Sequence, residues 1–162
     1  MRLLRLHGGG VAAVDDEDFE AVSQYRWRLY QPSAARTRTS RYAVACIGRR
    51  NVYLHLWLWK RWGRHKVPVV EHENTDGLDC TRDNLRNATV EQNNRNRGLM
   101  RSNTTGLKGV TWHIRHQKWH AKISVSKRRL HLGYFKNPQE AARAYNEAAL
   151  LHHGEFAVLN VV

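Results

Sequence analysis

The middle of the 162-residue chain carries a polar string whose residue types suit the hydrolysis of a phosphodiester bond. A short β-branched run ends in Glu71-His72, an Asp-Asn-Leu-Arg step follows at 83–86, and the string closes in asparagines at 93, 94 and 96. Such hydrolysis needs a base that activates water and a cation that neutralises charge on the phosphate and the leaving oxygen. His72 is of the right type for the base, and Glu71 offers a carboxylate oxygen to a hard cation.

Asn84 lies between the two ends of this string, where its amide could hold the loop or the imidazole in position. The same residue types also suit a polar, turn-rich loop that contains a histidine by chance. The composition of the string leaves both interpretations open.

The string resembles the HNH, or ββα-metal, endonuclease motif, in the variant of phage and intron homing endonucleases whose last His is Asn. That family reads roughly Val-Asp-His, then Asn-Leu-Arg, then Gln-Asn. This sequence has Val70-Glu71-His72, Asn84-Leu85-Arg86 and Gln92-Asn93. The spacings from His72 to Asn84 and to Asn93 also match those of the family.

The resemblance implies a role for each matching residue. His72 would be the general base, Asn84 the asparagine that braces the loop, and Asn93 the metal ligand on the helix. Glu71 stands where the family usually has Asp, the other ligand of a divalent cation. The implied cofactor is Mg²⁺, with Mn²⁺ as an alternative. Because Glu71 replaces Asp, a second hypothesis is a sequence-specific DNA-binding protein whose HNH site is inactive.

Further residues near the string belong to the same resemblance. Asn94 is an alternative metal ligand, one residue out of the spacing, and Arg86 and Arg95 are expected to contact phosphate. Upstream, Leu54-His55-Leu56 and a short helix resemble a Leu-His-Arg segment of the family, with Leu56 in place of the arginine. A histidine on a helix more often serves packing or surface than a site, so no role is assigned to His55.

Alternating residues in the C-terminal part of the chain predict a three-stranded sheet. The segment from Leu107 to His113 is the first candidate strand. In the stretches 119–125 and 129–132, apolar residues alternate with basic or polar ones. Because successive side chains of a strand point to opposite faces, the sheet would have one apolar and one basic face.

A helix is expected directly after this sheet. Asn137 is suited to the N-cap, Pro138 to the first helical position and Glu140 to the third, and Gly154 predicts the end. Alanines recur along one face of this helix, which allows it to lie close to the sheet. The helix would cover the apolar face and leave the basic face free.

This segment resembles the plant APETALA/ethylene-response-factor DNA-binding domain, which also occurs fused to HNH nucleases. The matching residues are Lys108-Gly109-Val110, Lys118-Trp119, Ala121-Lys122-Ile123, Leu132-Gly133-Tyr134-Phe135, Glu140 to Tyr145, and Gly154 to Asn160. In that family the sheet lies in the major groove of duplex DNA, which is wide enough for such a sheet, and the helix packs behind it. The resemblance and the alternation together imply these DNA contacts: Lys108, Thr111, His113, Arg115, Lys122, Ser124, Arg129 and His131.

Some positions depart from the plant pattern. Thr111 and His113 replace contact arginines and His131 replaces a contact tryptophan, so plant target sequences are not implied. Trp119 is expected in the core, because it shares a face with Ile123. RNA is a weaker alternative partner, because the expected sheet shows no row of exposed aromatic residues on which bases could stack.

The charge of the chain supports a nucleic-acid partner. Lys and Arg number 27 against 14 Asp and Glu, so the formal net charge is +13. Residues 1–65 hold 12 basic and 5 acidic residues, residues 66–102 hold six of each, and residues 103–162 hold nine and three. Two basic flanks therefore surround a neutral middle, and basic flanks are typical of phosphate contacts.

These patterns predict an α+β protein in four parts: a β-rich region with a short helix (1–65), the HNH module (66–97), a basic linker (98–106) and the C-terminal DNA-binding domain (107–162). The expected activity is that of a metal-dependent endonuclease acting on double-stranded DNA, which the C-terminal sheet would target. No obligate protein partner is inferred.

Several absences in the sequence indicate a location. The chain has no apolar run of transmembrane length and no signal-peptide h-region, and its two cysteines lack CxxC spacing. The expectation is a cytoplasmic protein without membrane contact, in the cytoplasm of a bacterial host if a phage encodes it.

Overall fold

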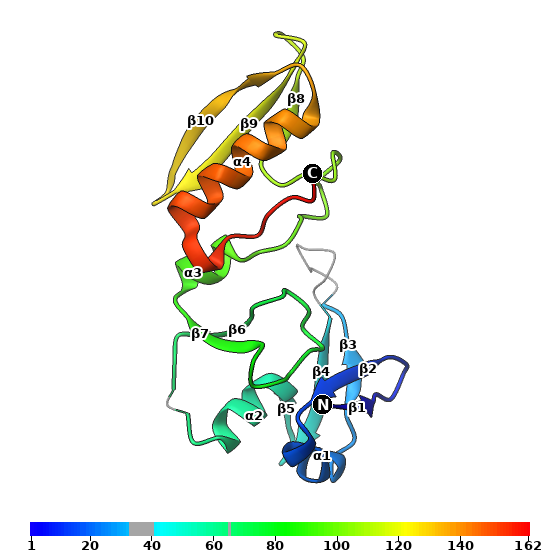
Figure 1. Ribbon diagram of the computed structural model, residues 1–162. Coiled ribbons are helices and arrows are strands. Elements are labelled where there is room, and N and C mark those ends of the chain that lie inside the picture. The colour runs from blue at the N-terminus through cyan, green and yellow to red at the C-terminus, as the bar shows by residue number, and fades with distance from the viewer. Residues whose placement is uncertain (33–40, 65) are drawn as a thin grey trace. The chain divides into compact units, whose positions relative to one another are not determined.

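The computed structural model describes residues 1–32, 41–64 and 66–162. It shows small antiparallel sheets and short helices, which confirms the predicted α+β class. The chain divides into two compact units, Met1–Asn93 and Asn94–Val162. Figure 1 labels their helices and strands and colours the chain by residue number. Within the described ranges, no helix has the length and apolar character needed to cross a membrane.

The first unit begins with a hairpin, a three-stranded sheet and two helices. Its first elements are β1 (Arg2–Arg5), β2 (Val11–Val14), α1 (Asp16–Ser23), β3 (Arg28–Tyr30), β4 (Tyr42–Ile47), β5 (Arg50–Tyr53) and α2 (Leu54–Arg61). Strands β1 and β2 pair with each other, and β3, β4 and β5 form a sheet in that order. Helix α1 was not expected. It begins in the acidic stretch, where carboxylates in the first turn favour the positive end of a helix.

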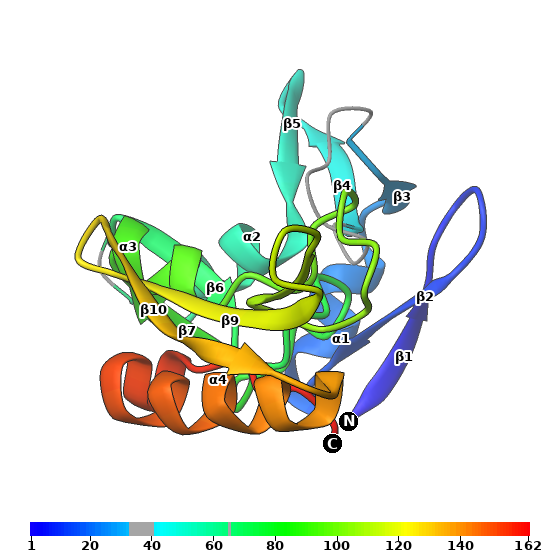
Figure 2. The same cartoon turned by 90° about the horizontal axis from the view of Figure 1, so that it is seen from above.

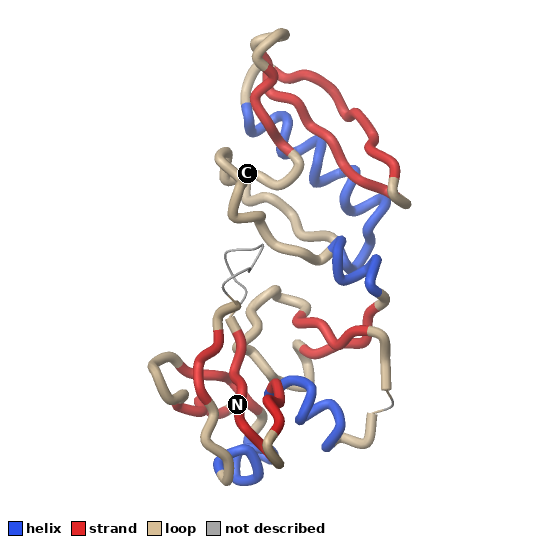
Figure 3. The backbone as a smooth tube through the Cα atoms, turned by 180° about the vertical axis from the view of Figure 1, so that it is seen from behind, coloured by secondary structure: helices blue, strands red, loops and turns tan. Residues whose placement is uncertain are grey.

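The candidate nuclease string follows as two strands and a helix. Strand β6 (Val69–His72) pairs antiparallel with β7 (Leu85–Ala88), and α3 (Val90–Arg95) comes next. The connection between the two strands, residues 73–84, is a long loop (Figure 3). The order β-β-α therefore places Glu71 and His72 at the end of the first strand, Asn84 just before the second, and Asn93 on the helix.

One apolar core holds the first unit together. It combines Leu4 of β1 and Leu58 of α2 with Leu78, Cys80 and Leu85 from the loop and strand of the polar string. The string contains few apolar residues of its own, and a small segment of this kind needs neighbours to bury enough surface. The apolar residues of the string are therefore buried against residues that precede it in the chain.

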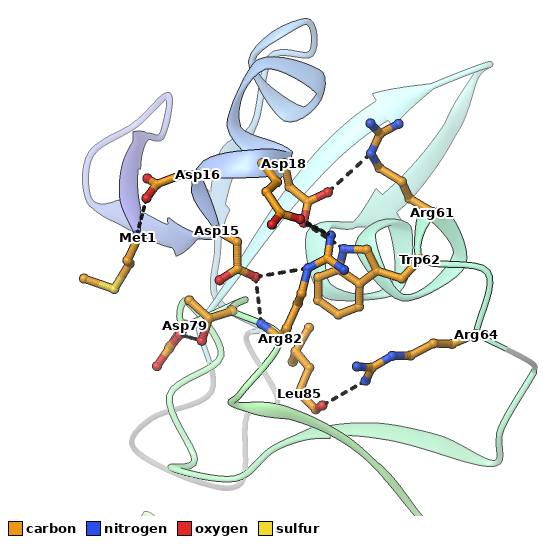
Figure 4. Close-up of polar contacts among 12 residues, drawn as sticks. Met1, Asp15, Asp16, Asp18, Arg61, Trp62, Arg64, Asp79, Arg82 and Leu85 are labelled. Atoms are coloured by element: carbon orange, nitrogen blue, oxygen red, sulfur yellow. Dashed lines mark hydrogen bonds and ion pairs between the residues drawn. The ribbon is translucent and has the colours of Figure 1, made fainter.

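A buried carboxylate joins the same parts of the first unit through polar contacts (Figure 4). The carboxylate of Asp18 in α1 accepts hydrogen bonds from Trp62 Nε1 at 2.7 Å, Arg82 Nη2 at 3.1 Å and Arg61 Nε at 3.4 Å. Arg82 belongs to the loop between β6 and β7, and its backbone amide also donates to Asp15. Helix α1, the end of α2 and this loop are thereby tied at one point.

The second unit is a three-stranded antiparallel sheet packed on one helix. Its elements are β8 (Val110–His113), β9 (Lys118–Val125), β10 (Arg128–Phe135), α4 (Pro138–His153) and the short 3-10 helix η1 (Gly154–Phe156). The strand order is β10-β9-β8, and all pairs are antiparallel. Helix α4 runs along one face of the sheet (Figure 2), where Val110 and Ala121 pack against Ala141 and Ala142.

The local signals around α4 are confirmed. Asn137 accepts a hydrogen bond from the amide of Glu140 at 2.8 Å, Pro138 opens the helix, and Gly154 ends it with a φ of 56°. The first strand is shorter than predicted, because Gly109 has a φ of 74° and leaves the extended conformation. A side chain at Gly109 would meet the Tyr145 ring at 2.1 Å, so the backbone passes this ring where only glycine fits.

Candidate nuclease site and nucleic-acid interface

Glu71 is a buried carboxylate with an arginine directly across the β6–β7 ladder. The register pairs Glu71 with Arg86, and Arg86 Nε donates to Glu71 Oε1 at 2.6 Å. Arg86 also lies 3.4 Å from Glu73 Oε2. The structure therefore places Arg86, an expected phosphate contact, on two carboxylates of its own hairpin.

The second carboxylate oxygen of Glu71 is different. Oε2 is buried and has no hydrogen-bond partner among the described residues. A buried acceptor without a partner is costly in free energy and calls for an explanation, such as a bound ion or a water molecule.

His72 lies beside Glu71 and is 7% exposed. Burial lowers the pKa of His72 to about 4, although Asp76 and Asp79 act in the opposite direction. The imidazole is therefore neutral at pH 7 and retains a lone pair for a proton. The Sγ atom of Cys80 lies 3.9 Å from its Nε2 atom.

His55 packs against His72, although no role was assigned to it from the sequence. The two ring centroids are 4.8 Å apart in an edge-to-face arrangement, and Tyr42 contacts both rings. Burial, and secondarily the neighbouring His72, lowers the pKa of His55 to about 3. The signal that could have found it is the Leu54-His55-Leu56 segment. Helix α2 begins at Leu54 and carries His55 on its buried side.

Asn84 is buried, and its amide bonds to the loop between β6 and β7. Its Oδ1 atom accepts from the amide of Asn74 at 3.0 Å, and its Nδ2 atom donates to the carbonyl of Asp79 at 2.7 Å. Its backbone carbonyl accepts from the amide of Glu73 at 2.9 Å. Of the two functions considered for this residue, these contacts correspond to holding the loop.

The residues expected to bind a metal have suitable chemistry. Asn93 lies on α3, half-buried, and its side chain makes no hydrogen bond to the described residues. Asn94, the alternative ligand, accepts a hydrogen bond from Arg97. Glu71 Oε2 and the amide oxygen of Asn93 are hard oxygen donors of the type Mg²⁺ prefers. Across residues 1–32, 41–64 and 66–162, His, Cys, Asp and Glu form no group of three that could hold a metal.

In the second unit, most of the expected DNA contacts share the sheet face opposite α4. The register pairs Thr111 with His120, Lys122 with His131, and Ser124 with Arg129. His113 follows on the same face, and Arg115 is exposed in the β8–β9 turn.

Lys108 and Arg95, both expected to contact DNA, lie outside the strands of this sheet. Lys108 Nζ donates to the backbone carbonyl of Arg95 at 2.7 Å. Burial, and secondarily Arg97, lowers the pKa of Lys108 to about 8. Lys108 therefore joins the segment after the first unit to the start of the sheet, and Arg95 lies at the end of α3.

The outer face of the sheet also carries a ring cluster that the sequence did not reveal: His113, His116, His120, His131 and Tyr134. Tyr134 contacts each of the four imidazoles, with ring centroids 4.5–5.1 Å away. A register shift between His131 and Gly133 makes this possible. Without it, simple alternation from His131 would place Tyr134 on the helix side.

The tryptophans of the second unit lie on the other face. Trp119 packs against the core beneath the sheet, as expected. Trp112 lies opposite it in the register and contacts it edge-to-face, but remains 48% exposed.

Comparison with known proteins adds one similarity. No known protein family matches the chain. The chain is 42% identical, over 45 residues, to an ethylene-responsive transcription factor-like protein of Arabidopsis thaliana. This stretch covers 28% of the chain and 19% of the plant protein, so the chain spans about a fifth of the relative it matches.

Proposed function

We propose that the protein binds double-stranded DNA through the outer face of the β8–β10 sheet. This face carries Lys122 and Arg129 among exposed polar residues, while α4 covers the other face. The similar plant protein is named as transcription factor-like, and transcription factors act on DNA. Lys and Arg on such a surface displace condensed counterions from the duplex.

We further propose that the β6–β7–α3 segment hydrolyses the DNA as an HNH-type endonuclease. The observation that carries this proposal is the neutral imidazole of His72 beside a buried carboxylate oxygen, Glu71 Oε2, that lacks a protein partner. A Mg²⁺ or Mn²⁺ ion held by Glu71 and Asn93 would supply positive charge for the leaving oxygen.

The residues of the chain would divide the remaining tasks. His72 would take a proton from the attacking water as its oxygen bonds to phosphorus and the bond to the 3′ oxygen breaks. Asn84, through its bonds to Asn74 and Asp79, would keep the loop after His72 in place. His55 would limit the rotation of the His72 ring by packing against it.

A second candidate is a DNA-binding protein whose nuclease site is inactive. The contact that favours it is the 2.6 Å ion pair between Arg86 and Glu71, because a guanidinium already neutralises the carboxylate expected to bind the cation. The low exposure of Glu71 and His72, 3% and 7%, favours the same reading.

A plasmid assay separates the two candidates. Wild type and His72→Ala are incubated with supercoiled DNA in Mg²⁺, Mn²⁺ or EDTA, and binding to a labelled duplex is measured alongside. Metal-dependent nicking by wild type alone supports the nuclease. Equal nicking by the variant refutes the role of His72, and duplex binding without nicking supports the second candidate.

A further inference from the structure

The five-ring cluster lies in a part of the chain without any carboxylate. Eleven Lys and Arg residues and no Asp or Glu occur between Glu91 and Glu140, a stretch that includes the whole sheet. The charged neighbours of the cluster are therefore basic: Arg115 in the β8–β9 turn, Lys118 and Lys122 on β9, and Arg129 on β10.

One imidazole of this cluster, His120, resists protonation while the protein is free. The pKa of His120 lies below the usual value for histidine, because of partial burial and because His131, Lys122, His113 and His116 place like charges beside it. No anionic side chain on the sheet offsets that repulsion. An anion from outside would remove it.

One pair of rings is built to accept a proton. His120 Nε2 and His131 Nδ1 lie 2.8 Å apart, so one nitrogen donates and the other accepts. A single added proton can go to an outward nitrogen and leave this hydrogen bond intact. A second proton would turn both facing nitrogens into donors and break it.

We propose that the ring cluster formed by His113, His116, His120, His131 and Tyr134 is a phosphate-binding site of the DNA interface that takes up at least one proton when duplex DNA binds. The proposal rests on the proposed DNA binding of this face and not on the nuclease activity. The phosphate supplies the counter-charge that the sheet lacks, so its binding and the protonation of the cluster favour each other. Tyr134, which is 36% exposed, contacts the rings from the centre of the cluster.

Linkage gives the size and the sign of the expected effect. Each proton taken up on binding raises the association constant by up to about tenfold for each pH unit of acidification. We expect the affinity for a duplex to increase at least about tenfold between pH 7.5 and pH 5.5, since one proton is the minimum uptake.

The test is fluorescence anisotropy with a labelled 30-base-pair duplex from pH 5.5 to 8.0. Ionic strength is fixed, phosphate buffers are avoided because they would compete, and EDTA prevents cleavage. The variant carries Gln for the four clustered histidines, His113, His116, His120 and His131. The matched control carries Gln at two histidines outside the cluster, His7 and His152.

The expected result is a steep pH dependence in wild type and control, and a nearly flat one in the cluster variant. Circular dichroism checks that the variant is folded, and a second variant, His120→Gln/His131→Gln, should fall between the two. An equal slope in wild type and cluster variant, or no slope in wild type, overturns the proposal but leaves DNA binding standing. No duplex binding at any pH defeats the proposed DNA binding as well.

Discussion

Replacing Arg86 with leucine tests the ion pair at the candidate nuclease site. The side chains of Arg86 and Glu71 are 16% and 1% exposed, and the two charged groups lie 2.6 Å apart. Removing the guanidinium would leave Glu71 as a buried charge without a counter-charge, and losses of this kind lower the free energy of unfolding by about 3–5 kcal/mol. The second oxygen of Glu71 has no hydrogen bond among the described residues that could reduce this loss.

Urea unfolding, followed by tryptophan fluorescence, measures the effect. Four of the six tryptophans, at positions 27, 57, 59 and 62, lie in the first unit and report on it. With a urea dependence of about 2 kcal/mol per M, the midpoint should fall by roughly 1.5–2.5 M. The control Arg50→Leu removes an exposed arginine from β5 and should change stability by less than about 0.5 kcal/mol.

The double variant Glu71→Gln/Arg86→Leu should recover much of the loss, because it removes the uncompensated charge. A loss below about 1 kcal/mol for Arg86→Leu would place the pair in the range of exposed ion pairs and refute the reasoning. Mg²⁺ adds a functional readout. If Glu71 binds the cation, millimolar Mg²⁺ should stabilise Arg86→Leu more than wild type, and equal stabilisation would remove Glu71 from the proposed metal site.

Three further outcomes follow from other contacts. Asn84→Ala leaves a buried amide and a carbonyl of the loop without partners and should lower stability by about 1–3 kcal/mol in urea titrations. Asn137→Ala removes the cap of α4 and should cost about 1 kcal/mol, whereas Asn137→Asp should retain most of it in thermal unfolding of the same chain. The pKa values of His55 and His72 are lowered to about 3 and about 4 in the folded protein. As the pH falls, the unfolded chain therefore takes up protons at these histidines before the folded protein does. Their contribution to stability is complete above about pH 6.5 and is lost as the pH falls towards 4, and His55→Phe should make this loss shallower in acid titrations.

Local signals in the sequence predicted the second unit well. Asn137, Pro138 and Gly154 determine the limits of α4 through interactions with near neighbours, so they can be recognised without a fold. The alternation in β9 correctly predicted that Ala121 and Ile123 are buried, because it too depends on neighbouring residues alone. The start of the first strand was predicted too early, because the positive φ of Gly109 depends on the approach of Tyr145 from α4.

The environment of each site depends on contacts that no local pattern encodes. His55 and His72 meet only because α2 and β6 pack together, and Arg86 reaches Glu71 only through the register of β6 with β7. Tyr134 joins the imidazoles because of the register shift after His131, which reverses the alternation for the end of β10. The sequence indicated residue types that could act together. Which residues contact one another could be seen only in the tertiary structure.

The distribution of acidic residues separates the two proposed activities. The three acidic side chains of the second unit, Glu140, Glu147 and Glu155, belong to α4 or η1, which leaves the sheet without an acidic side chain. Eleven of the 14 acidic residues lie in the first unit, and Glu71 and Asp18 there are buried in ion pairs with arginines. The sheet is therefore the surface that we propose for duplex binding, and the proposed hydrolysis requires that Glu71 exchange Arg86 for a cation. Loss of cleavage on mutation of the first unit should leave DNA affinity and its pH dependence intact, since the groups that would produce them lie in the second unit.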